Sequence, residues 1–153
     1  MDAKNKGKER SLLVSVIADA TTVTGLLLTG IGERNAKGQQ NFMIVDKDTS
    51  NEMIEAQLKQ LIDRDDIGVI LISQNVAEKV RAIIVAHEKL FPTILEIPSK
   101  DNPYDPEKDT IVLRAAAILW GSESGPEKLR EMNGAKAWLH LHILINQIIS
   151  IHI

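Results

Sequence analysis

The chain contains no cysteine and few aromatic residues, and neither sign of charge dominates. The lack of cysteine excludes disulfides and thiolate metal sites, and it suits a reducing compartment. The net charge is -3, whereas proteins that bind nucleic acid typically carry a strong excess of basic residues. No segment reaches about 18 uninterrupted apolar residues, so the sequence predicts no membrane-spanning helix. We therefore expect membrane association only through a partner.

The length and the hydrophobic content predict one compact domain with appendages. The chain has 153 residues, of which 44% are hydrophobic, and this is enough for a core. Its first ten residues, MDAKNKGKER, are polar and basic and lack the apolar stretch of a signal peptide. We expect residues 1–10 to be a disordered basic lead-in and residues 11–98 to form the folded domain.

Four short apolar runs are predicted to be strands, and they alternate with helical patterns. They cover residues 12–18, 42–45, 68–72 and 93–97. Because these runs are apolar almost throughout and rich in Val and Ile, they are typical of parallel strands buried on both faces. Right-handed crossovers then predict an α/β fold. It is a small Rossmann-like, doubly wound, four-stranded parallel sheet in the order 2-1-3-4, with helices on both faces.

The first crossover helix is predicted to begin at Asp19 or Thr21 and to end at Gly30 or Gly32. A glycine inside a helix is unfavourable, so we expect Gly25 to permit a close approach of helix and sheet.

The next two helices have their own signals. Thr49 and Glu52 form a capping box at the start of the second helix. The third is expected to be a single helix that Asn75 caps and that stops at Phe91, before Pro92.

A fourth helix follows the last predicted strand through a proline-rich turn. Asp105 suits its N-cap and Pro106 its first position, and the helical pattern runs to residue 120. Three helices already cover the sheet, so we expect residues 99–120 to form a turn and a C-terminal partner-binding helix. Its apolar stripe, the predicted partner-binding residues, consists of Ile111, Val112, Ala115, Ile118 and Leu119.

The stretch DATTVTGLLLTGIGE, residues 19–33, looks like a phosphate-binding loop but lacks the chemistry of one. Gly25 and Gly30 have the spacing of a P-loop, but Ile31 and Gly32 stand where Lys and Ser or Thr are needed. The dinucleotide fingerprint also fails, because the glycines do not directly follow the strand. We interpret these glycines as structural.

The carboxyl ends of the predicted strands are where a doubly wound sheet binds ligands. They present Asp19, Asp46, Ser73, Pro98 and Ser99, which include no histidine and no nucleophile with a base. A receiver domain would need an aspartate where Ser73 stands. We therefore predict no enzyme, no catalytic residue and no cofactor. The alternative is a nucleotide-binding or receiver-like regulatory module.

Four segments resemble the F subunit of the eukaryotic vacuolar-type proton-pumping ATPases (V-ATPases), collinearly from about Leu12 to Arg114. They are VTGLLLTGIGE, NFMIVDKDT, RDDIGVILISQNVAEKVR and FPTILEIPSKDNPYDPEKDTIVLR. The resemblance implies a non-catalytic central-stalk subunit, or rotor, of the peripheral sector. It also implies a C-terminal helix packed along the coiled coil of the D subunit, and coupling of ATP hydrolysis in neighbouring subunits to proton transport. No cofactor is implied.

The resemblance further implies a location on the cytoplasmic face of vacuolar or other endomembranes, as a peripheral part of the complex, with a free pool in the cytoplasm. The helix alone would bind weakly, because burying about five apolar side chains yields roughly 5–10 kcal/mol while association costs roughly 4–15 kcal/mol. We therefore expect the sheet domain and the loop of residues 32–41 to add contacts to the D subunit or to other subunits.

The pattern leaves the family after Arg114, and we predict that residues 121–153 are a non-family C-terminal extension, as from a variant or mis-spliced message. Residues 121–125 are expected to form a linker, and residues 126–132 a short helical turn.

The last stretch, WLHLHILINQIISIHI, alternates apolar and polar residues as a β-strand does. A metal site at His140 and His142 would lack a third ligand close by, so we predict no metal. A long β-prone segment without charge is more typical of an aggregation hazard.

Overall fold

The structure is a computed structural model that describes residues 12–35 and 38–131. The predicted lead-in, residues 1–10, lies outside the described residues, and so does the alternating stretch with His140 and His142.

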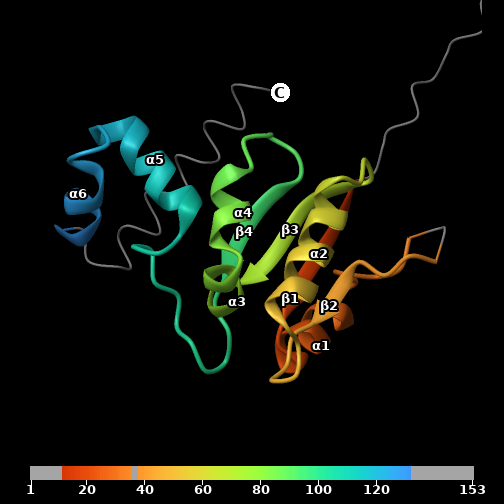
Figure 1. Ribbon diagram of the computed structural model, residues 1–153. Coiled ribbons are helices and arrows are strands. Elements are labelled where there is room, and N and C mark those ends of the chain that lie inside the picture. Colours follow the sequence, from red (N-terminus) through yellow and green to blue (C-terminus); the bar gives the residue numbers. More distant parts are fainter. Residues whose placement is uncertain (1–11, 36–37, 132–153) are drawn as a thin grey trace, which may run out of the picture. The chain divides into compact units, whose positions relative to one another are not determined.

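The chain forms two compact units, residues 1–100 and residues 101–153, and the first is built on a four-stranded parallel sheet (Figure 1). The strand order is β2-β1-β3-β4. The predicted α/β class and strand order are therefore confirmed, and no strand end differs from its prediction by more than one residue. The strands are β1 (Leu13–Ala18), β2 (Phe42–Ile44), β3 (Ile67–Ser73) and β4 (Thr93–Ile97).

The helices of this unit cover both faces of the sheet, as predicted. The chain turns from β1 toward one edge of the sheet and from β2 and β3 toward the other, so right-handed crossovers place α1 on one face and α2, α3 and α4 on the opposite face. Two core clusters correspond to these two layers. The helices are α1 (Ala20–Leu28), α2 (Asn51–Ile62), α3 (Gln74–Lys79) and α4 (Arg81–Ala86).

The two faces are covered unequally. On one face, α1 contacts β1 and β2, and its Val23 is fully buried against Val16 and Ala18. Side chains of β3 and β4 on the same face are only half-buried. These are Val69, Leu71, Leu95 and Ile97.

The predicted ends of α1 are confirmed. The Asp19 carboxylate accepts hydrogen bonds from the backbone amides of Thr21 and Thr22, each at 3.0 Å. Gly30 follows the end of the helix with a φ of 88°, the left-handed conformation that glycine adopts without strain.

The predicted role of Gly25 is wrong. A Cβ at Gly25 would meet no atom within 4 Å, so this glycine does not bring α1 close to the sheet. The close approach is at Gly32 instead, where a Cβ would lie 3.0 Å from Val16 Cγ1 and where φ is 85°. The helical pattern could not predict the close approach at Gly32, because Gly32 lies beyond the end of α1.

The predicted Thr49–Glu52 capping box of α2 is wrong, because the N-cap lies one residue later. Ser50, not Thr49, is the N-cap, and its hydroxyl accepts from the backbone amide of Met53 at 3.3 Å. The Thr49 hydroxyl donates to Asp46 at 2.7 Å. This local turn after β2 competes with the cap for the threonine hydroxyl and takes it.

The prediction of a single third helix is also wrong, because the helix is interrupted at Val80 and forms α3 and α4. Asn75, the predicted cap, lies inside α3, and α4 ends before the predicted stop at Phe91. Directly after the break, Arg81 forms an ion pair with the buried Glu96 of β4. Leaving a buried carboxylate without its partner costs several kcal/mol, roughly 3–5, so this contact outweighs the continuous apolar pattern.

The second unit contains α5 (Thr110–Trp120) and α6 (Gly125–Glu131). The predicted helical turn at residues 126–132 is α6, and α5 ends at residue 120 as predicted.

The predicted start of α5 is wrong by one helical turn. Asp109 is the N-cap, and its carboxylate accepts from the backbone amides of Ile111 at 2.8 Å and Val112 at 3.2 Å. Asp105 closes the preceding turn instead, accepting from the amide of Glu107 at 3.0 Å.

We predict that Gly25→Ala raises the free energy of unfolding by about 1 kcal/mol, because alanine is favoured over glycine in a helix by about that amount and the new methyl group meets nothing. Gly32→Ala is the matched control and should lower it, because φ is 85° there and Val16 is close. Urea unfolding followed by circular dichroism measures both. A loss of stability in Gly25→Ala would contradict the exposed position of this residue.

Candidate functional site

The carboxyl ends of the strands carry the residues that the sequence places there, but their side chains serve the fold. Besides the two backbone amides, the Asp19 carboxylate accepts from the Thr22 hydroxyl at 2.6 Å. Asp46 accepts from the Thr49 hydroxyl at 2.7 Å. Both carboxylates therefore close local turns or caps.

The pKa values of these two carboxyls keep them charged. Burial raises the pKa of Asp19, but hydrogen bonds from Thr22 and Thr21 outweigh it, and the net shift is downward. The Thr49 hydroxyl lowers the pKa of Asp46. Two carboxylates at this edge repel a phosphate group, which weakens the nucleotide-binding interpretation further.

Ser73 stands at the end of β3, where a receiver domain would carry its phosphoacceptor. It is fully buried, and its hydroxyl is without a hydrogen-bond partner among residues 12–35 and 38–131. The nearby cation, Arg81, is engaged with Glu96. Pro98 and Ser99 follow the end of β4. Ser73 therefore offers no carboxylate acceptor for phosphate chemistry.

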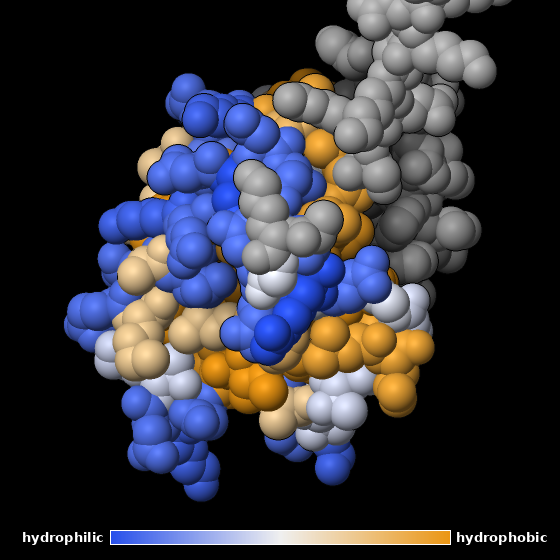
Figure 2. All heavy atoms as spheres, turned by 90° about the vertical axis from the view of Figure 1, so that its right-hand side faces the viewer, coloured by the Kyte–Doolittle hydropathy of each residue, from blue (hydrophilic) through white to orange (hydrophobic). Residues whose placement is uncertain are grey.

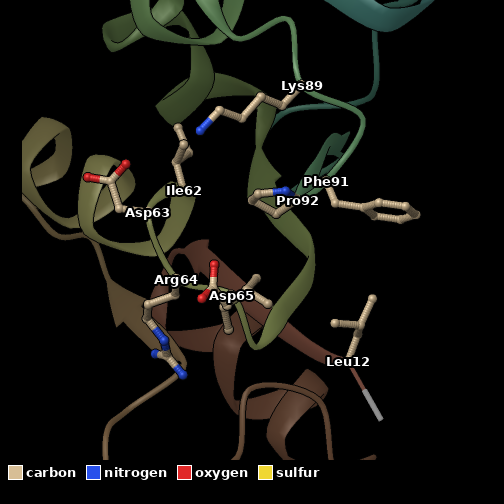
Figure 3. A pocket seen from close by; sticks show the side chains of 9 residues that line it. Leu12, Ile62, Asp63, Arg64, Asp65, Lys89, Phe91 and Pro92 are labelled. Atoms are coloured by element: carbon tan, nitrogen blue, oxygen red, sulfur yellow. The ribbon is translucent and has the colours of Figure 1, made fainter. Parts of the chain in front are cut away.

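A cavity of about 390 Å³ lies at the opposite edge, where β1, β3 and β4 begin. Figure 3 shows that the Arg64 guanidinium points away from Lys89. The Phe91 ring points outward, away from Pro92. The side chains do not converge on a common point, as a ligand site would require.

Arg64 belongs to a network that secures the loop between α1 and β2. It forms a two-pronged ion pair with Asp66, in which Nε and Nη2 each lie 2.8 Å from a carboxylate oxygen. Asn35, in the loop, donates to the same carboxylate at 3.0 Å, and its own carbonyl oxygen accepts from the backbone amide of Gln39 at 2.9 Å. The network ties the base of the loop to the turn between α2 and β3.

The pKa of Asp66 shows how strongly this network binds the charged carboxylate. Hydrogen bonds from Arg64 lower the pKa of Asp66 well below its usual range, partial burial opposes them, and Asn35 adds to the lowering. The sequence analysis named the loop but missed this anchor. A signal was present, because Asn followed three residues later by Gly is typical of a tight turn.

No three His, Asp or Glu side chains lie close enough to hold a metal ion in the described part of the chain. His87 shares a hydrogen bond of 2.9 Å with the carbonyl of Pro92. The predicted absence of a metal at His140 and His142 stays a prediction, since both lie outside the described residues. Of the helices described, none combines the length and the apolar character needed to cross a membrane.

Apolar surface on the sheet unit is visible from the side of β2 (Figure 2). Polar residues cover much of this side, and apolar residues gather in its lower part. Large exposed apolar side chains of α1, β2 and α2 are Leu28, Ile44 and Met53. Such surface is more typical of protein contacts than of a small-molecule site.

The predicted partner-binding stripe of α5 is divided in the structure. Ile118 is 79% exposed and Leu119 is 40% exposed. Val112 and Ala115 are buried, and Ile111 is half-buried. Only the C-terminal part of the stripe is therefore open to a partner.

The sequence analysis missed two features of this helix. Trp120 lies outside the stripe but is also exposed at the end of α5. Val112 packs in a cluster with Ala116 and with Leu129 of α6. Helical periodicity identifies an apolar face, but it does not say which other segment covers it.

Comparisons with known proteins match most of the chain. A family model described as ATP synthase (F/14-kDa) subunit matches residues 14–114, more than half of the sequence. The V-type proton ATPase F subunit of Homo sapiens is 52% identical over 110 residues, which cover 72% of this chain and 92% of that protein. The V-type proton ATPase F subunit of Dictyostelium discoideum is 46% identical over 109 residues, which cover 71% of this chain and 91% of that protein.

A solved structure is also similar, the F subunit of the V-type ATP synthase from Archaeoglobus fulgidus. It is 27% identical, and the match covers 57% of this chain and 98% of that chain with a TM-score of 0.43.

We predict that Asp66→Asn lowers the free energy of unfolding at pH 7 by about 1 kcal/mol, a value that allows for solvent screening because the Asp66 side chain is 42% exposed. The lowered pKa means that Asp66 stabilises the fold fully above its unfolded pKa of about 3.9. This contribution disappears as the pH falls, so the difference between wild type and variant should shrink between about pH 5 and about pH 2.

Urea unfolding at a series of pH values measures this difference. Asp65→Asn is the matched control, with the same chemical change at an exposed neighbour. Equal and pH-independent effects of the two substitutions would show that the network does not stabilise the fold.

Proposed function

Because the chain belongs to the F-subunit family of the V-type ATPases, we propose that it is a non-catalytic central-stalk subunit, or rotor, of the peripheral sector of such an enzyme. In this role it couples ATP hydrolysis in neighbouring subunits to rotation and proton transport. The observation that carries the proposal is the 52% identity to a V-type proton ATPase F subunit over 92% of its length. The carboxyl edge of the sheet supports a non-catalytic role, because the carboxylates there cap a helix and close a turn.

The proposed partner of α5 is the coiled coil of the D subunit. Ile118 and Leu119 are exposed, and Ile111 is half-buried beside them. Because Leu119 and Ile111 are already partly buried, completing the burial of the three side chains provides roughly 2–4 kcal/mol, against an association cost of roughly 4–15 kcal/mol. The helix therefore requires a second contact for stable binding. The proposed second contact is the loop of residues 32–41, which would touch the D subunit or another subunit. Asp66 secures the base of this loop.

The proposed location follows from membership in the complex. The chain would lie on the cytoplasmic face of vacuolar or other endomembranes as a peripheral part of the complex, with a free pool in the cytoplasm.

We predict that Ile118→Asp, alone or with Ile111→Asp, weakens binding to the purified D subunit at least tenfold. A carboxylate placed in an apolar contact must be desolvated without a partner, and each tenfold change corresponds to about 1.4 kcal/mol. Co-purification, followed by calorimetry, measures the effect.

The matched control is Leu90→Asp, which changes an exposed leucine between α4 and β4 in the same way. It should leave binding unchanged. If Ile118→Asp and the double variant bind the D subunit as well as wild type does, α5 is not the partner-binding helix.

We further predict that the isolated chain binds no ATP in equilibrium dialysis. Saturable ATP binding at micromolar concentration would support the nucleotide-binding module instead.

A further inference from the structure

We propose that α6 is a displaceable cover on α5, so that the C-terminal extension of this chain competes with the coiled-coil partner for the partner-binding stripe. The proposal rests on the proposed function, since it concerns the same helix. The new element is that α6, the next helix along the chain, regulates partner binding by α5.

The cover lies outside the part of the chain that resembles the family. The family model ends at Arg114, inside α5, and α6 begins at Gly125. Both helices and the turn between them belong to the second unit. The competing segment is therefore a property of this chain's own extension.

The contact between the two helices takes a residue of the stripe. Val112 is 2% exposed, and it lies in one apolar cluster with Ala116 of α5 and Leu129 of α6. Tyr104 and Leu113 flank this cluster. A partner that uses the whole stripe must therefore take the place of Leu129 against Val112.

The start of α6 packs directly on the backbone of α5. A Cβ at Gly125 would lie 2.9 Å from the carbonyl carbon of Ala116, closer than side chains approach a backbone atom. Glycine is what allows this approach, and a larger residue at position 125 would push the two helices apart.

The interactions described for the cover are individually weak. It is a helix of seven residues, too short to be stable by itself. Among its described side chains, Leu129 is the large apolar one that is buried. The ion pair of Arg130 with Glu107 joins side chains that are 68% and 47% exposed, and pairs this exposed contribute little.

A coiled coil has the chemistry to displace this helix. Its apolar side chains recur every three or four residues along one seam, so it can contact Val112, Ile118 and Leu119 together. It would thus replace the contact of Leu129 and also bury the exposed end of the stripe, which α6 leaves open.

The test uses the full chain and the purified D subunit, with calorimetry as the measurement. Leu129→Asp and Gly125→Val release α6 by different means, the first by placing a charge in the apolar cluster and the second by bulk. Both should bind the D subunit at least tenfold more tightly than wild type. Glu127→Asp, which places the same new side chain on an exposed position of α6, should bind like wild type.

The remaining outcomes overturn the proposal in distinguishable ways. If both release variants bind like wild type or more weakly, and Ile118→Asp abolishes binding, α5 binds the partner but α6 does not compete for it. If neither wild type nor the release variants bind the D subunit, the proposed function fails as well. Circular dichroism of each variant tests whether the total helix content is unchanged, so that a loss of binding is not a loss of folded structure.

Discussion

The parallel pairing of β1 with β3 is the constraint on which the rest of the sheet unit depends. Parallel neighbours cannot be joined by a tight turn, so each connection crosses a face of the sheet as a helix. The right-handed sense of these crossovers then places α1 on one face of the sheet and α2, α3 and α4 on the other. The half-buried aliphatic side chains of β3 and β4, such as Leu71 and Leu95, follow directly, because no crossover of this unit returns over them.

The strands could be predicted from the sequence because short runs rich in Val and Ile alternate with helical patterns. Residues 68–72, for example, carry no polar side chain, and β3 extends one residue beyond them at each end. Caps were less predictable where two polar residues compete. Asp109 rather than Asp105 caps α5, and the Tyr104 hydroxyl donates to its carboxylate at 2.6 Å. Such a contact decides between candidates whose local sequences are both suitable.

Contacts between distant residues explain the features that the sequence did not reveal. Arg81 pairs with Glu96 directly after the break at Val80, and Asn35 bonds to Asp66 at the base of the loop. Helical periodicity also identified the stripe of α5 but not its division, because Leu129 comes from a segment with no counterpart in the family pattern. The absence of a phosphate site stays a prediction, which rests on the missing lysine.

The two surfaces considered for partner binding have different physical origins, and this affects how binding can be regulated. Asn35, at the base of the loop, donates a hydrogen bond to Asp66, which forms an ion pair with Arg64, so this base is tied to the turn before β3. The stripe of α5 is covered in part by a short helix with one large buried side chain. If α5 binds the proposed partner weakly, as its small apolar area implies, a small change in the cover would alter a large fraction of the net binding free energy. Both core clusters of the sheet unit consist of residues before position 101, so such regulation leaves that core unchanged.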